Sequence, residues 1–155
     1  MKKLTPKEAL IKTRQICSKQ EKCISEISTK LKDWQITEEE QNKIIENLLF
    51  EKFIDENRYA TIYTREKFKF NKWGKIKIRY SLKQLNISTN IIEEALETID
   101  PEEYINLINS ELIKKRKTIN TKNKYQIRNK MFNFALGRGF ESDLIKTEID
   151  KIQAL

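Results

Sequence analysis

The sequence of 155 residues is long enough for one domain or a few small repeats, and 38% of its residues are hydrophobic while 35% are charged. Its net charge of +8 is typical of chains that bind a polyanion: nucleic acid, an acidic protein or an anionic membrane surface. Three Gly and two Pro are too few for the turns of an all-β fold, and no apolar run is long enough for a transmembrane helix.

The common catalytic and metal-binding motifs are missing from the sequence. There is no His, the commonest general base, and no nucleophile elbow, phosphate-binding loop or dinucleotide-binding glycine motif. Cys17 and Cys23 are too few for a zinc site, so we expect two reduced thiols in a helical core. Nothing in the sequence argues for an enzyme, and we expect no cofactor and no metal. The N-terminus lacks the apolar core of a signal peptide, and we expect a cytoplasmic protein that binds no membrane.

In chain order, a helix start with the same capping pattern is repeated. Thr5 and Asp100 each precede a Pro at the first helical position and a Glu at the third, and Asp55 is the corresponding cap between them. A helix end is repeated as well, because an apolar residue closes a helix just before a cap-type residue at Ile36, Ile87 and Phe140. Spacings of about 50 residues indicate stacked supersecondary units.

These landmarks and the charges together predict nine helices in groups of three. The predicted helices span residues 5–22, 23–35, 37–53, 56–70, 72–86, 88–99, 101–118, 122–137 and 142–153. The third helix of each group is acidic, while the first and second hold most of the basic residues. We therefore predict an all-α fold of three tandem three-helix repeats, with boundaries at 1–54, 55–99 and 100–155.

The segment 71–88 allows two interpretations. Residues 75–80 alternate polar and apolar like a half-buried strand, but helical spacing explains more of the pattern. On a helix, one buried face consists of Ile78, Leu82 and Leu85, and a second consists of Trp73, Ile76 and Tyr80. Gly74, near the start of this helix, would allow another backbone to approach closely.

The same helix would carry a ridge of basic side chains, which the strand interpretation leaves unexplained. The ridge consists of Lys72, Lys75, Arg79 and Lys83. We predict that it contacts phosphates or an acidic protein surface; the alternative is a solvated face paired with the acidic third helices.

Residues 114–130 contain eight basic side chains and no acidic one. They are Lys114, Lys115, Arg116, Lys117, Lys122, Lys124, Arg128 and Lys130. Such a run is typical of a segment that contacts a polyanion, and the alternative is a flexible, solvated loop between two helices. Tyr125 within it could stack on a base, but we expect it to anchor the segment in the core.

Aromatic residues and lysines also alternate in residues 67–73, as they do in nucleic-acid grooves. Phe68 and Phe70 cannot share one helix face, so we expect one to pack inward and the other at the helix junction. Trp34 and Trp73 hold similar places in their repeats, which favours a packing role.

Several runs resemble the RecX family of bacterial recombinase regulators, over nearly the whole chain. They are FIDENRYATIY (53–63), KFNKWGKIKIRYSLKQLNIS (69–88), IIEEAL (91–96), FALGRGFESDLI (134–145) and, more weakly, CISEISTKLKDWQI (23–36). The Trp-Gly pair at 73–74 and the Arg-Gly-Phe run at 138–140 are similar to the version in a Bacteroidetes-like branch. Many relatives have Gly-Ile ahead of the third helix, where this chain has Gln35-Ile36 and Asn86-Ile87.

This resemblance implies an elongated, curved array of three-helix repeats without enzymatic activity. It implies a negative regulator of RecA in DNA repair, homologous recombination and the SOS response, which binds the RecA–single-stranded DNA filament in its groove and inhibits it. The implied partners are this filament and single-stranded DNA, with duplex DNA as a further candidate, and we expect a monomer. The alternative is a helical-repeat nucleic-acid-binding protein without a recombinase partner. The family offers no catalytic motif, so the twelve basic residues named above are binding candidates by charge placement alone.

Overall fold

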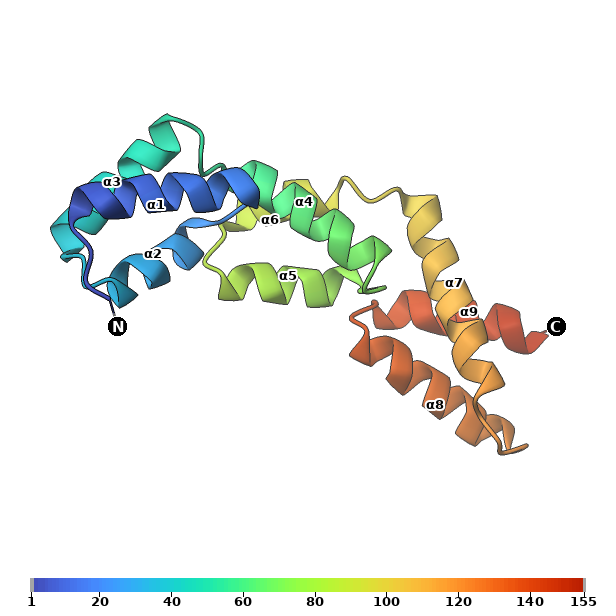
Figure 1. Cartoon of the computed structure of the whole chain (residues 1–155). Coiled ribbons are helices and arrows are strands. Elements are labelled where there is room, and N and C mark those ends of the chain that lie inside the picture. The colour runs from blue at the N-terminus through green and yellow to red at the C-terminus, as the bar shows by residue number, and fades with distance from the viewer. Residues whose placement is uncertain (1, 155) are drawn as a thin grey trace. The chain divides into compact units, whose positions relative to one another are not determined.

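A computed structural model describes residues 2–154, which form nine α-helices and no strand (Figure 1). The helices are α1 (Pro6–Lys19), α2 (Ile24–Asp33), α3 (Glu38–Phe50), α4 (Glu56–Lys69), α5 (Lys75–Gln84), α6 (Thr89–Leu96), α7 (Pro101–Lys117), α8 (Lys124–Gly137) and α9 (Ser142–Ala154). Each overlaps one predicted helix, so the all-α prediction is confirmed. None of the helices in this part of the chain is long and apolar enough to cross a membrane.

The predicted helix starts are confirmed by their hydrogen bonds. The Thr5 hydroxyl accepts the Glu8 N–H at 3.2 Å, and the Glu8 carboxylate accepts the Thr5 N–H at 3.1 Å. The Asp55 carboxylate accepts the Arg58 N–H, and that of Asp100 accepts the Glu103 N–H, each at 3.0 Å. These caps satisfy backbone donors that the first turn of a helix leaves without partners.

The second helix of each group of three ends in the same left-handed turn. In these three turns the residues with positive φ are Gln35 (60°), Asn86 (59°) and Gly139 (91°). The next residue donates its N–H back into the helix, as shown by the bonds Ile36–Leu31 (3.0 Å), Ile87–Leu82 (3.2 Å) and Phe140–Ala135 (3.3 Å). This is the Schellman arrangement, and it confirms the repeated helix end that the sequence predicts.

The chain forms two compact units. Unit 1 comprises Met1–Ile62 and Leu82–Ile92, and unit 2 comprises Tyr63–Ser81 and Glu93–Leu155. The repeat boundaries at 54/55 and 99/100 and the elongated, curved arrangement stay predictions.

The core of unit 1 is aliphatic. α1 and α2 both pack against α3. The buried residues of this cluster are Leu4, Ala9, Ile27, Leu31, Ile36, Ile44, Leu48 and Ile54. Removing their apolar surface from water is the main stabilising contribution here, at roughly 25 cal/mol per Å².

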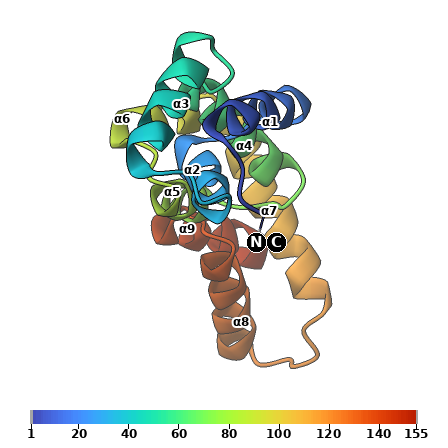
Figure 2. The same ribbon diagram turned by 60° about the vertical axis from the view of Figure 1, so that its left-hand side comes forward.

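In unit 2, α7, α8 and α9 all contact one another (Figure 2). Their fully buried side chains include Ile108, Leu112, Met131, Phe140, Ile145 and Ile149. The two views agree that the α7–α8 connection lies at a projecting end of this three-helix group (Figures 1 and 2).

Unit 2 also contains a direct backbone contact between two glycine positions. The N–H of Gly74 donates to the carbonyl of Arg138 at 2.7 Å, and the N–H of Ile76 donates to that of Gly139 at 3.0 Å. A Cβ on Gly74 would lie 2.3 Å from the Gly139 carbonyl oxygen. The predicted close approach of a backbone at Gly74 is therefore confirmed.

Tyr104 joins the same helices from the side. Its hydroxyl accepts the Lys75 N–H at 2.9 Å and donates to the Glu141 carboxylate. Its ring contacts those of Phe68 and Phe140, with centroids 6.1 and 5.7 Å away. Burial and the bond to Glu141 raise the pKa of the Tyr104 hydroxyl far above its usual range. The start of α5 and the start of α9 are thereby held against α7.

Candidate nucleic-acid and filament interface

The predicted basic ridge of the middle helix is shorter than expected. The prediction placed Lys72 on a helix starting at 72, but α5 begins at Lys75 because the preceding residues form the glycine contact and a turn. Lys72 has a φ of 59°, and its ammonium donates to the Lys69 carbonyl at 2.6 Å. The ridge on α5 therefore consists of Lys75, Arg79 and Lys83.

The three remaining ridge residues differ in what they contact. Both the Nε and the Nη2 of Arg79 donate to the Glu93 carboxylate, at 2.9 and 3.0 Å. This bond raises the pKa of the Arg79 guanidinium above its already high value. The Lys75 ammonium lies 4.9 Å from the centroid of the Tyr104 ring. Lys83, in unit 1, is exposed and forms no ion pair with any described residue.

Only one of the two predicted buried faces of α5 is buried. Ile78 and Leu82 are fully buried, as expected. Ile76 and Tyr80 are 47% and 65% exposed, so the prediction of a second buried face is wrong. The spacing of apolar residues predicted the helix correctly. It could not show that no other element packs against the side of α5 that carries Ile76 and Tyr80.

Trp73 packs between two lysines. The ammonium groups of Lys67 and Lys77 lie 5.0 and 4.7 Å from the centroid of its indole. Such cation–π contacts contribute about 0.5–1 kcal/mol each at exposed sites. The predicted packing role of Trp73 fits these contacts. Lys67 and Lys77 were not among the predicted binding residues, although their alternation with aromatic residues is visible in the sequence.

Most of the second basic segment is helical, and only residues 118–123 form the connection between α7 and α8. Lys114, Lys115, Arg116 and Lys117 form the last turn of α7, where cations interact favourably with the negative end of the helix dipole. The connection is held at both ends, because Ile119 is buried and the side-chain Oδ1 of Asn123 accepts the Gln126 N–H at 3.1 Å. Lys124, Arg128 and Lys130 lie on α8.

Three cations of this segment are engaged by neighbouring side chains. Arg128 bonds to Asp150 at 2.7 Å and to Gln153 at 3.1 Å. Lys114 lies 3.5 Å from the Glu111 carboxylate, and the Lys115 ammonium lies 5.4 Å from the centroid of the Phe134 ring.

The other five cations form no ion pair with any residue between 2 and 154, and we call them the unpaired cations. They are Arg116, Lys117, Lys122, Lys124 and Lys130, and all five are exposed. Unpaired cations can neutralise phosphates without first breaking an internal ion pair.

One expected anchor in the core is instead exposed. Tyr125 is 73% exposed in the first turn of α8, so the prediction that it anchors the segment in the core is wrong. The buried anchors are its neighbours Ile119 and Ile127. Phe68 packs inward, as expected for one of the pair, while Phe70 is 79% exposed at the end of α4.

A small cavity of about 190 Å³ opens beside the unpaired cations. It is lined by Arg116, Lys124, Met131, Ile152 and Gln153. Its two cations and apolar floor suit a phosphate-bearing group better than a neutral apolar ligand.

Comparison with known proteins places these two basic segments within recognised domains. The family model for the second three-helix domain of RecX matches residues 55–96, and that for the third matches residues 102–148. The regulatory protein RecX of Clostridium botulinum (strain Eklund 17B / Type B) is 35% identical over 155 residues, covering 94% of this chain and 71% of the relative. The chain belongs to the RecX family.

Further relatives agree with this assignment. The regulatory protein RecX of Chlorobium phaeobacteroides (strain BS1) is 31% identical, with 82% of each chain covered. A crystal structure of regulatory protein RecX matches 94% of this chain and 73% of its own, at 25% identity and a TM-score of 0.86. The crystal structure of RecX from Lactobacillus salivarius has the same fold, at 23% identity, 97% coverage of both chains and a TM-score of 0.87. The Bacteroidetes-like branch stays a prediction.

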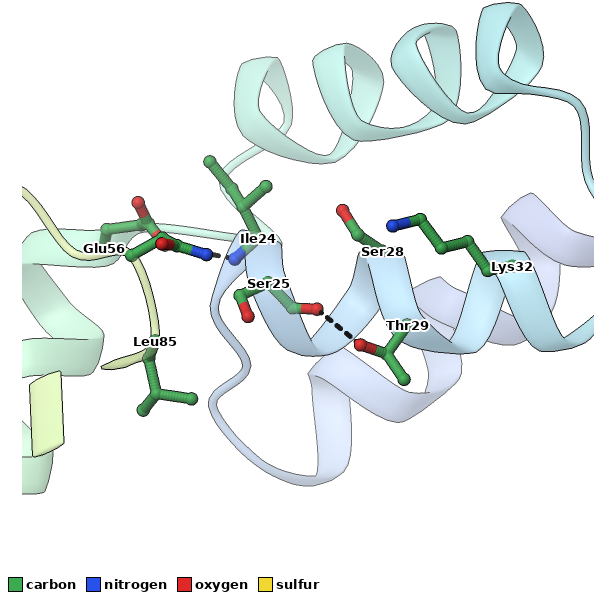
Figure 3. Close-up of a pocket in the computed structure, with 8 residues that line it drawn as sticks. Ile24, Ser25, Ser28, Thr29, Lys32, Glu56 and Leu85 are labelled. Atoms are coloured by element: carbon green, nitrogen blue, oxygen red, sulfur yellow. Dashed lines mark hydrogen bonds between the residues drawn. The ribbon is translucent and has the colours of Figure 1, made fainter. Parts of the chain in front are cut away.

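Within this RecX-family chain, unit 1 also has a polar cavity, of about 340 Å³ (Figure 3). The Glu56 carboxylate accepts the Ile24 N–H at 3.1 Å, and burial raises the pKa of that carboxyl. The Thr29 hydroxyl donates to the Ser25 carbonyl at 3.1 Å. Lys32 is its single lining cation and the Glu56 carboxylate also lines it, so this cavity is a poor site for a polyanion.

The cysteines have little reactive character. Cys17 and Cys23 are both free thiols, and Cys23 is buried. Burial raises the pKa of the Cys23 thiol to about 11 and also raises the pKa of the Cys17 thiol. Among the described residues, no group of His, Cys, Asp and Glu side chains could hold a metal ion.

Proposed function

We propose that this RecX-family protein is a negative regulator of a RecA recombinase, which it inhibits by binding the RecA–single-stranded DNA filament in its groove. Its curated relatives are named regulatory proteins, and its two basic segments lie in the matched second and third domains. The observation that carries the proposal is the cluster of unpaired cations around the α7–α8 connection. This inhibition requires binding and no catalysis by the protein itself. We propose that the protein acts as a monomer in the cytoplasm.

The physical basis of binding is neutralisation of phosphate and acidic side-chain charge. Each phosphate contact on a single strand contributes a slope of roughly 0.7 in log affinity against log salt concentration. Inhibition needs more than affinity, because a ligand shifts an equilibrium only by its differential affinity for two states. The protein therefore either binds an inactive form of the filament more tightly or blocks the groove against a second DNA.

A matched pair of triple variants tests the proposal. Arg116/Lys117/Lys122→Ala removes three unpaired cations of unit 2, while Lys3/Lys7/Lys19→Ala removes three exposed lysines of unit 1. Both variants lose the same charge, and Ala keeps the helices intact. The readout is ATP hydrolysis by RecA on single-stranded DNA as each variant is added.

We expect the unit 2 variant to lose inhibition and to flatten the salt slope on single-stranded DNA by about 2, while the control keeps both. Equal inhibition by the two variants would contradict the assignment of this surface. A wild-type protein that binds DNA but leaves RecA hydrolysis unchanged would favour a nucleic-acid-binding protein without a recombinase partner.

A further inference from the structure

Highly exposed aromatic rings are few in this protein and are unevenly distributed. Among the described residues they are Phe50 (86% exposed), Phe70 (79%), Tyr80 (65%) and Tyr125 (73%). The last three belong to unit 2, and Phe50 belongs to unit 1. An exposed ring leaves apolar surface in water. Single exposed rings are common in proteins, so these rings are informative because three of them have similar neighbouring residues.

The three rings of unit 2 share a strongly basic setting. Within five residues along the sequence from Tyr125 and from Tyr80 there are four Lys or Arg and no acidic residue, although Arg79 beside Tyr80 is bonded to the Glu93 carboxylate. Within five residues of Phe70 there are five Lys or Arg and one Glu. Around Phe50 the balance is reversed, with Glu46, Glu51 and Asp55 against Lys52.

Contacts inside unit 2 leave these three rings available. Trp73 is occupied by the ammonium groups of Lys67 and Lys77, and Phe134 by Lys115 and Arg138, whose guanidinium lies 4.9 Å from its centroid. Each of these cation–π pairs covers a ring within the protein. The rings of Phe70, Tyr80 and Tyr125 remain mostly in water.

We propose that unit 2 binds single-stranded nucleic acid by base stacking on Phe70, Tyr80 and Tyr125, while cations beside each ring contact the flanking phosphates. Unpaired bases present a π face to such rings, and basic side chains follow the backbone between them. A duplex keeps its bases stacked on one another, so it gains only the phosphate contacts. The inference rests on the proposed single-stranded DNA contact and adds the groups that recognise bases.

Two oligonucleotides of equal length separate stacking from charge. One is oligo(dT) and the other is the same backbone with abasic sites throughout, so both present the same phosphates. Wild-type protein should bind the base-bearing strand about fivefold or more tightly, since a stacked base is worth at least that factor. Single variants Phe70→Ala, Tyr80→Ala and Tyr125→Ala should each reduce this preference and leave the salt slope unchanged.

Conservative and matched controls complete the experiment. Phe70→Tyr and Tyr125→Phe keep a ring and should keep the preference, and Phe50→Ala removes an equally exposed ring from acidic surroundings and should change nothing. Circular dichroism of each variant checks the helix content, which surface substitutions of this kind leave intact.

Equal wild-type affinity for both strands would overturn the stacking inference while leaving the proposed regulation of RecA in place. Ring variants that weaken binding of RecA but keep the base preference would also overturn it, in favour of a protein contact. Wild-type protein that binds neither strand would overturn the proposed DNA contact itself.

Discussion

The two units of this protein differ in how their charges and rings are used. Unit 1 has 13 basic and 11 acidic residues, a net charge of +2, while unit 2 has 18 and 12, a net charge of +6. In unit 1, Arg58 bonds to Glu21 at 2.6 Å, and Lys43 lies near Glu39 and Glu40. In unit 2, ion pairs such as Arg79–Glu93 coexist with the unpaired cations and three exposed rings.

The structure separates cations that the sequence leaves equivalent. Arg79 and Lys124 were equal candidates in the sequence, but a carboxylate neutralises only the first. Exposed pairs contribute about 0–1 kcal/mol, so unit 2 gains little stability from its charge.

We expect the largest loss of stability from a substitution at the glycine contact of unit 2. Gly74→Leu would place a Cβ 2.3 Å from the Gly139 carbonyl oxygen. The backbone at Gly139 cannot move away as the end of a flexible side chain could. We expect a loss of about 3 kcal/mol or more in unfolding free energy, measured by urea denaturation.

Gly137→Ala is the control for that substitution. Nothing lies within 4 Å of its added Cβ, and Gly137 is the last residue of α8, so Ala should be neutral or stabilise by up to about 1 kcal/mol. Equal stability of the Gly74 and Gly137 variants would contradict the described contact.

Tyr104→Phe removes the hydroxyl that links α5, α7 and α9. It leaves the Lys75 N–H without its acceptor, at a cost of about 1–3 kcal/mol. Because the folded state keeps this hydroxyl protonated beyond its usual pKa of 10.0, wild-type stability should fall as the pH rises past that value. The variant should lose less stability between pH 9 and 11; parallel pH profiles would contradict the role of the buried hydroxyl.

Local sequence signals predicted much of the fold. Caps such as Thr5 and Asp100 depend on residues three positions away, and the turn at Gly139 depends on the backbone freedom of one residue. Asn86 and Gln35 adopt the same left-handed turn, Gln35 although its side chain disfavours it. Gly74 was identified because a glycine near a helix start allows another backbone to approach closely.

The side-chain partners could not be predicted, because they depend on contacts distant in sequence. Tyr125 looked like a core anchor, yet Ile119 and Ile127 fill that place. The sequence of α5 itself does not show that the side chain of Ile76 is exposed. Glu93 lies 14 residues from Arg79, so its carboxylate could be assigned to that guanidinium only from the structure.

Single charge removals sharpen the distinction between paired and unpaired cations. Arg79→Gln should cost about 1 kcal/mol or less in stability and leave the salt slope on single-stranded DNA nearly unchanged. Lys124→Gln should leave stability unchanged and flatten the slope by about 0.7. The reverse pattern, measured by fluorescence anisotropy across a salt series, would show that the internal pairing does not decide which cations bind DNA.

The smallest effect concerns the thiols of unit 1. With its pKa at about 11, roughly one Cys23 in a thousand is a thiolate at pH 8, so alkylation should be slow in the folded protein and fast in urea. Cys17, which is half-buried, should react faster than Cys23. Mass spectrometry of alkylated peptides measures both rates, and a fast-reacting Cys23 in folded protein would contradict its burial.

Hydrogen exchange on the filament tests the central claim, that unit 2 makes the nucleic-acid contact, most directly. Exchange of the α7–α8 connection and the α4–α5 turn is compared with that of α1–α3, for free protein and for protein added to RecA on single-stranded DNA. The account predicts slowed exchange at residues 118–126 and 70–74 and little change in α1–α3. Protection confined to α1–α3, with both unit 2 segments unchanged, would contradict it.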